Sequence, residues 1–164
     1  MTRTCIVADA GPLIALARVG QIELLRCLFA TVVVPTAVYA ECVRMPEKQG
    51  ATAVAQAVET GRLTVRSPSQ QEPATPSPRL GIGERQAIML ALELSCPVLL
   101  DDKLARAHAR HAGVAVIGIG GLLIAAKDEA LIPAVGPLLR ELWQAGYHFS
   151  EELIARILEL AGEG

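Results

Sequence analysis

Short apolar runs alternate with amphipathic segments along the whole chain. The apolar runs predict five short strands, at residues 4–8, 31–34, 62–67, 97–100 and 114–118. Between and after them, apolar residues recur at helical spacing, most clearly in "GIGERQAIMLALELS". Strands that alternate with helices favour a parallel sheet covered on both faces. The pattern therefore predicts an α/β fold.

Turn and cap residues set the expected limits of the helices. Pro12 suits the first turn of a helix after the first strand, and Pro35 ends the second strand and opens another helix. Gly61 and Gly113 fit positions just past helix ends, and Ser150 fits an N-cap. Four further helices are expected in the segments 49–60, 120–131, 133–146 and 150–162.

One segment departs from this alternation. Four of the ten prolines fall within residues 67–78, with Ser, Gln and Thr between them. We expect a Pro/Ser-rich surface loop at about residues 67–80 within a single domain spanning 1–164.

Composition narrows the class of protein. Hydrophobic residues make up 52% of the chain and aromatic residues only 3%, so Leu, Ile, Val and Ala must build the core. The net charge of −2 gives no overall attraction to nucleic acid or membrane, so an anionic partner needs a local basic patch. The longest uncharged apolar stretch, residues 112–126, is shorter than the roughly 18 residues of a membrane span.

The N-terminus and the cysteines indicate a cytoplasmic protein. Asp9 falls where a signal peptide would keep its apolar region. The four cysteines lie far apart with no Cys-x-x-Cys pair, which is typical of reduced, mostly buried thiols.

Carboxylates follow two of the predicted strands. Asp9 ends the first strand, and the adjacent Asp101 and Asp102 end the fourth. Ligands of open α/β sheets bind outside the carboxyl ends of the strands, so we expect these groups at one edge. Glu41, in an otherwise apolar helix, and Glu84, in a first helical turn, are further candidates.

Each acid also has a simpler interpretation when it is taken alone. Asp9 and one member of the Asp101–Asp102 pair could cap helices, Glu41 could lie in solvent, and Glu84 could complement a helix dipole. Together, however, converging carboxylates repel one another unless a cation neutralises them. Hard oxygen ligands suit Mg²⁺ or Mn²⁺, whose waters can attack a phosphodiester.

Several stretches, in this order, resemble the PIN-domain superfamily of ribonucleases, in particular prokaryotic PIN-like proteins akin to VapC toxins. They are "VADAGPLIALARVGQIELL", "VVVPTAVYAECV", "LGIGERQAIMLALEL", "VLLDDKLARAHARHAGVAVIGIGGLLIAAK" and "FSEELIARILELAGE". The resemblance implies a three-layer α/β/α sandwich with a central, mostly parallel five-stranded sheet.

The resemblance also implies an acidic site and an activity. Catalytic and metal-binding roles would fall to Asp9, Glu41, Glu84 and Asp101, with Asp102 as an adjacent metal-ligand candidate. Such proteins are typically Mg²⁺- or Mn²⁺-dependent endoribonucleases. Many are toxins neutralised by a small antitoxin protein, and many are homodimers. Gly11 departs from the pattern, because many PIN proteins place Ser or Thr there. A non-catalytic PIN-like module that binds RNA or a protein is therefore the alternative.

Other features allow weaker predictions. Lys103, Arg106 and Arg110 share one face of a predicted helix beside the two aspartates and could guide an RNA backbone or dock an acidic antitoxin segment. The "GIGG" at residues 118–121 could bind an anion or a nucleotide, but a tight turn with close helix packing explains it more simply. The aromatic residues Trp143, Tyr147 and Phe149 could stack on bases, form core or face a dimer partner.

Overall fold

A computed structural model of the chain describes residues 3–44, 50–70 and 79–164. Its centre is a five-stranded sheet in the order β3-β2-β1-β4-β5, and every neighbouring pair is parallel. The strands are β1 (Arg3–Ala8), β2 (Phe29–Pro35), β3 (Thr64–Arg66), β4 (Val98–Leu99) and β5 (Val116–Ile117). All five predicted strands are present, although β3, β4 and β5 are shorter than expected.

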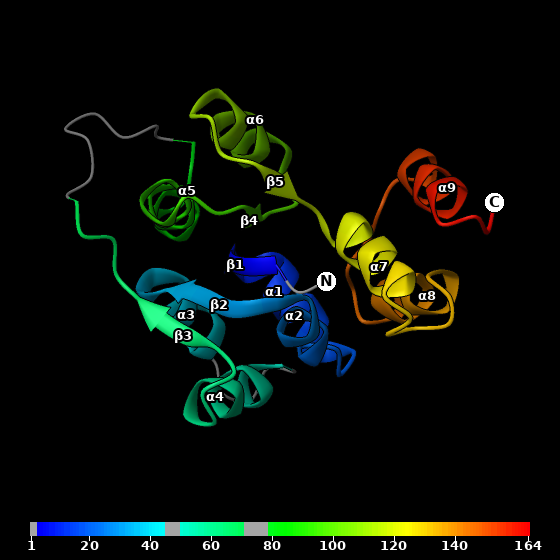
Figure 1. Cartoon of the computed structure of the whole chain (residues 1–164), viewed down its shortest axis with the longest axis horizontal. Coiled ribbons are helices and arrows are strands. Elements are labelled where there is room, and N and C mark those ends of the chain that lie inside the picture. Colours follow the sequence, from blue (N-terminus) through cyan, green and yellow to red (C-terminus); the bar gives the residue numbers. More distant parts are fainter. Residues whose placement is uncertain (1–2, 45–49, 71–78) are drawn as a thin grey trace.

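Helices connect the strands and cover both faces of the sheet. In Figure 1, α5 and α6 lie on one side of the sheet, whereas α1 to α4 lie on the other. The bounds of the helices are α1 (Ala10–Arg18), α2 (Glu23–Leu28), α3 (Thr36–Val43), α4 (Ala51–Glu59), α5 (Ile82–Leu94), α6 (Lys103–His111), α7 (Ile119–Asp128), α8 (Gly136–Gln144) and α9 (Glu151–Leu160). The predicted α/β/α sandwich with a parallel five-stranded sheet is therefore confirmed.

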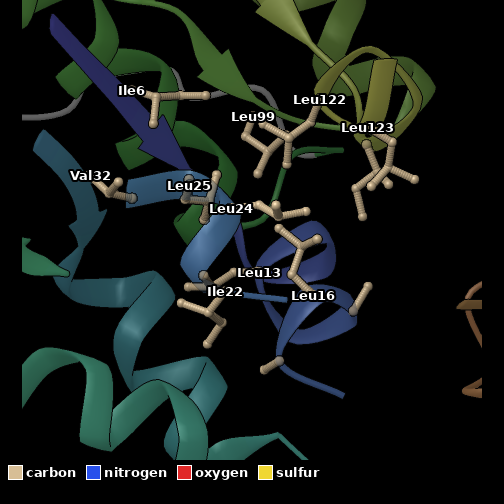
Figure 2. Packing of buried hydrophobic residues seen from close by; sticks show 14 of the residues in the cluster. Ile6, Leu13, Leu16, Ile22, Leu24, Leu25, Val32, Leu99, Leu122 and Leu123 are labelled. Atoms are coloured by element: carbon tan, nitrogen blue, oxygen red, sulfur yellow. The ribbon is translucent and has the colours of Figure 1, made fainter. Parts of the chain in front are cut away.

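The two-residue period of the strands distributes their side chains between two cores. Ile6 and Ala8 of β1 pack with α1, α2 and α7, whereas Val7 between them packs with α5 and α6. In β2, Val33 likewise points away from its neighbours. Figure 2 shows the first core, where strand residues meet leucines of three helices, among them Leu13, Leu25 and Leu122. Burying one such side chain stabilises the fold by about 1.5–3 kcal/mol.

Most of the expected helix limits are confirmed. Gly61 and Gly113 follow their helices with φ of 75° and 85°, a left-handed conformation that glycine adopts without strain. The Ser150 hydroxyl accepts a hydrogen bond from the Leu153 amide at 3.1 Å and caps α9. By contrast, the helix expected from residue 133 begins only at Gly136.

Two sequence predictions fall partly outside the described residues. Of the loop expected at about 67–80, residues 71–78 are not described, and the flanking residues 67–70 and 79–80 are neither helix nor strand. The start expected for the fourth helix, Gln49, is also outside the described residues. In the described part of the chain, none of the helices has the length and apolar character needed to cross a membrane.

The C-terminal helices are joined by one carboxylate. Glu163 accepts hydrogen bonds from the amides of Val135 and Gly136, at 2.8 and 3.0 Å, and from Lys127 Nζ at 3.0 Å. The two amides, aided by Lys127, lower the pKa of Glu163 to about 2. This contact ties the end of α9 to the beginning of α8.

Close packing of α7 on α9 yields a first prediction. A Cβ atom at Gly120 would lie 2.6 Å from Cδ1 and 2.7 Å from Cγ1 of the buried Ile157. We expect Gly120→Ala to lower the free energy of unfolding by about 1–3 kcal/mol through overpacking, as measured by urea denaturation. Gly121→Ala is the matched control, since its Cβ would meet Ile117 at an ordinary 3.7 Å. Equal effects of the two substitutions would contradict this account.

Candidate active site

A cavity of about 470 Å³ lies where the carboxyl ends of β1 and β4 meet the amino ends of α1, α5 and α6. All five acidic residues predicted from the sequence line this cavity: Asp9, Glu41, Glu84, Asp101 and Asp102. The three predicted basic residues do not. Lys103 and Arg110 are exposed on α6, and Arg106 lines a neighbouring cavity of about 330 Å³.

Asp9 is the most buried of these acids, with 7% of its surface exposed. It occupies the N-cap position of α1, yet its side chain does not cap the helix. The pKa of Asp9 is raised to about 7, mainly by burial. A hydrogen bond from the Ala10 backbone acts in the opposite direction, and the charges of Glu84, Glu41 and Asp102 add to the increase. The capping interpretation is therefore wrong for this side chain, which lies in a strongly negative field instead.

A close approach of α3 and α5 brings Glu41 toward Glu84. Gly83 makes it possible, because a Cβ atom there would lie 3.1 Å from Val38 Cγ2 and 3.4 Å from Glu41 Oε2. Glu84 also accepts a hydrogen bond from the Gly81 amide at 3.1 Å, which stabilises the start of α5. Its predicted role at the helix terminus is confirmed, and the same carboxylate borders the cavity.

The two adjacent aspartates, Asp101 and Asp102, contact different parts of the chain. Asp102 caps α6 by accepting a hydrogen bond from the Ala105 amide at 2.9 Å. Asp101 reaches the start of α7, where the Ile119 amide donates to its Oδ2 at 3.2 Å and its Oδ1 at 3.3 Å. The hydroxyl of Tyr147 donates to Oδ2 of the same carboxylate. One member of the pair therefore caps a helix, while the other joins the sheet edge to the C-terminal helices.

The glycine run at the start of α7 makes this arrangement possible. A Cβ atom at Gly118 would lie only 2.6 Å from Asp101 Oδ1, so only glycine leaves room for the carboxylate. At Gly120 the same absence of a side chain admits Ile157. The interpretation of "GIGG" as a site of close packing is confirmed.

Sequence reasoning missed Arg44 as a residue of the cavity, and it named Tyr147 only as a candidate for base stacking, the core or a dimer face. Arg44 follows α3 and is exposed. Tyr147 follows α8, and burial together with the Asp101 carboxylate raises the pKa of its phenol above the ordinary value. Its ring also meets Phe149 edge-on, at a centroid distance of 5.2 Å. No motif marks Tyr147, because its partner lies in a distant segment of the chain.

The donor chemistry of the cavity fits a hydrated divalent cation. Among the described residues, no three Asp, Glu, His or Cys side chains are grouped closely enough to coordinate one ion. Mg²⁺, however, usually keeps several waters and binds through one or two carboxylates. Burial is the main cause of the raised pKa of Asp9, and the charges of Glu84, Glu41 and Asp102 add to it, so a cation in this cavity would favour the ionised carboxylate.

Comparisons with known proteins give the family. A family model described as a PIN domain matches residues 5–163, nearly the whole chain. The chain belongs to the PIN-domain family. No curated protein sequence matches it.

A solved structure supports the fold of this PIN domain. It is a PilT N-terminus domain protein from the hyperthermophilic archaeon Sulfolobus solfataricus P2, with 19% sequence identity and a TM-score of 0.54. The match covers 90% of this chain and 98% of the archaeal chain. At this identity the likeness extends to the fold alone.

The raised pKa of Asp9 predicts a pH-dependent stability. Below about pH 4 the folded and unfolded states both carry the proton, and as the pH rises through about 7 the folded state must ionise a buried group. Stability from protonated Asp9 is therefore lost with rising pH. Without divalent cations, we expect Asp9→Asn to be more stable than the native protein, and the gain at pH 8 to exceed that at pH 5 by about 2–3 kcal/mol.

Thermal unfolding of both proteins in EDTA measures this difference. Glu59→Gln, which removes an exposed carboxylate at the end of α4, is the control and should show no such gain. If the gain from Asp9→Asn were the same at both pH values, the burial account of Asp9 would be wrong.

The Tyr147–Asp101 hydrogen bond predicts a loss of stability when it is removed. We expect Tyr147→Phe to lower the free energy of unfolding by about 1.5–3 kcal/mol, the range for hydrogen bonds to charged groups. Urea denaturation measures the loss. Tyr39→Phe is the matched control, because the hydroxyl of Tyr39, which is half-buried, makes no hydrogen bond within the described ranges. A Tyr147→Phe variant as stable as the native protein would contradict the contact.

Proposed function

We propose that this PIN domain is a metal-dependent endoribonuclease that cleaves RNA phosphodiester bonds. The observation that carries the proposal is the gathering of five carboxylates around one cavity at the carboxyl edge of the sheet, in a chain of the PIN-domain family. PIN domains are generally nucleases, and carboxylate oxygens are ligands that Mg²⁺ and Mn²⁺ prefer.

The residues of the cavity would divide the work. Asp9, Glu41, Glu84 and Asp101 would hold one or two Mg²⁺ or Mn²⁺ ions, directly or through water, and Asp102 is an additional candidate ligand. A bound ion of this kind polarises a phosphoryl oxygen and lowers the pKa of water. Tyr147 and the Ile119 amide would fix the orientation of Asp101. Arg44, which is exposed and lines the cavity, would attract the phosphodiester backbone.

Substrate attraction requires local positive charge, because the chain as a whole carries −2. Lys103, Arg106 and Arg110 of α6 supply it next to Asp101 and Asp102. We propose that they bind RNA phosphates near the carboxylate cavity. A cluster of this kind raises the rate of encounter and makes binding sensitive to salt.

We further propose that the protein acts as the toxin of a toxin–antitoxin pair, with a small antitoxin protein as partner, and that it forms a homodimer. The support is the resemblance of its motifs to VapC-type proteins, in which these properties are common. A cytoplasmic location would accord with both partners.

A second candidate function is a non-catalytic module that binds RNA or a protein. Two observations favour it. No group of three potential metal ligands is close enough for direct coordination within the described residues, and both oxygens of Asp101 already accept hydrogen bonds. Calorimetry with Mn²⁺ separates the two functions, since absence of binding at millimolar metal favours the non-catalytic module.

The leading proposal predicts RNA cleavage that depends on added metal. Purified protein should cleave single-stranded RNA with Mn²⁺ or Mg²⁺ and not in EDTA. Asp9→Asn and Asp101→Asn should each lower the rate by at least about 100-fold, since each would remove a metal ligand. Glu59→Gln is the control and should keep the native rate.

The expected stability of the Asp9→Asn variant excludes unfolding as an explanation for lost cleavage. Because we expect the substitution to stabilise the fold at pH 8, loss of cleavage there could not be attributed to unfolding. Unchanged cleavage in both aspartate variants would overturn the assignment of the site.

A further inference from the structure

The cavity of about 330 Å³ beside Asp101 is separate from the carboxylate cavity and has a different character. It lies between the edge strand β5, the first turn of α7 and one face of α9. Asp101 lines both cavities, so the two meet at a single side chain. Two arginines, Arg106 of α6 and Arg156 of α9, lie in its lining.

The guanidinium of Arg106 has a hydrogen-bond donor without a partner in the described part of the chain. Its Nε atom is buried and has no hydrogen-bond partner among the described residues. None of the ion pairs found in that part of the chain includes Arg106. A buried donor without a partner destabilises the fold, so an anion that accepts a hydrogen bond from this guanidinium would remove that cost.

Arg156 adds a second, easily redirected cation. Its side chain is 65% exposed, and its contact with Glu159 is a weak 3.9 Å ion pair within one helix turn. An exposed pair of this kind contributes little, so an incoming anion can recruit the guanidinium. The amino end of α7 opens onto the same cavity through Gly120 and Gly121, whose amides belong to the first helical turn.

The rest of the cavity is apolar. Ile117, Phe149 and Leu153 are part of its wall, and its volume is at the lower end of the range of about 300–1,000 Å³ for ligand pockets. Such a wall suits the base or sugar of one nucleotide, while two arginines suit its phosphate, which guanidinium groups bind in a bidentate manner. The negative charge of Asp101 is moderated by the hydrogen bonds from Tyr147 and Ile119.

We propose that this second cavity binds the nucleotide next to the scissile bond, with its phosphate between Arg106 and Arg156. The RNA strand then passes over Asp101 from the arginine cavity into the carboxylate cavity. This inference rests on the proposed function, because it assigns a substrate subsite to the same enzyme. It adds Arg156, which is remote in sequence from the basic residues of α6.

Binding of a fluorescently labelled single-stranded RNA oligonucleotide, followed by anisotropy in EDTA, tests the subsite without cleavage. We expect Arg156→Gln and Arg106→Gln each to weaken binding by about fivefold or more and to reduce the slope of log K against log salt by about 1. Arg140→Gln is the matched control, since Arg140 is exposed on α8 and lines a different cavity. It should change neither quantity. Calorimetry should show native Mn²⁺ affinity in Arg156→Gln.

The possible outcomes separate this inference from the proposed function. If the native protein cleaves RNA but Arg156→Gln binds it like the control, the subsite is wrong and the nuclease stands. If RNA binding depends on both arginines but no metal supports cleavage, the subsite stands and the nuclease is wrong. If an oligoglutamate peptide, but not RNA, loses affinity in Arg156→Gln, the cavity belongs to an acidic protein segment and the inference is overturned.

Discussion

The structure depends on the burial of the carboxyl-terminal half of β1 in the centre of the sheet. Ile6, Val7 and Ala8 have no exposed surface, and they point alternately into the two cores. A strand paired on both sides and covered on both faces can present a polar group only where it ends. Asp9 stands at that end, still largely buried, and the raised pKa of its carboxyl is the electrostatic consequence. The fold thus keeps a carboxylate in a place where a bound cation would stabilise its charged form.

A second constraint links this edge to the C-terminal helices. Asp101 accepts hydrogen bonds from the first amide of α7 and from Tyr147 after α8, so one carboxylate joins the sheet to both. Glu163 fastens α9 to the start of α8, and Gly120 lets α9 approach α7. The geometry around the carboxylate cavity therefore depends on packing far from its acids. Loss of that packing would release Asp101 as well as lower stability.

The two neighbouring cavities have complementary chemistry. One is bordered by carboxylates and suits cations, whereas the other combines arginines with an apolar wall and suits a nucleotide. A nuclease needs both, because phosphate binding and metal binding place opposite demands on the protein. The two cavities lie on either side of Asp101, whose carboxylate accepts hydrogen bonds from Ile119 and Tyr147, so the two kinds of charge stay apart. Under the proposed function, this division would let a chain with a net charge of −2 bind RNA.

The sequence by itself determined the five parallel strands, most helix limits and the place of Asp9, Asp101 and Asp102 at one edge of the sheet. These features follow from local periodicity and from the rule that parallel strands end on the same side, so neighbouring residues encode them. Only the tertiary structure decided that Asp102 caps a helix while Asp101 holds Tyr147, and that Arg106 and Arg156 share a cavity. Those contacts join segments that are distant along the chain. The packing of α7, α8 and α9 determines which residues meet, and the spacing of residues along the sequence does not predict that packing.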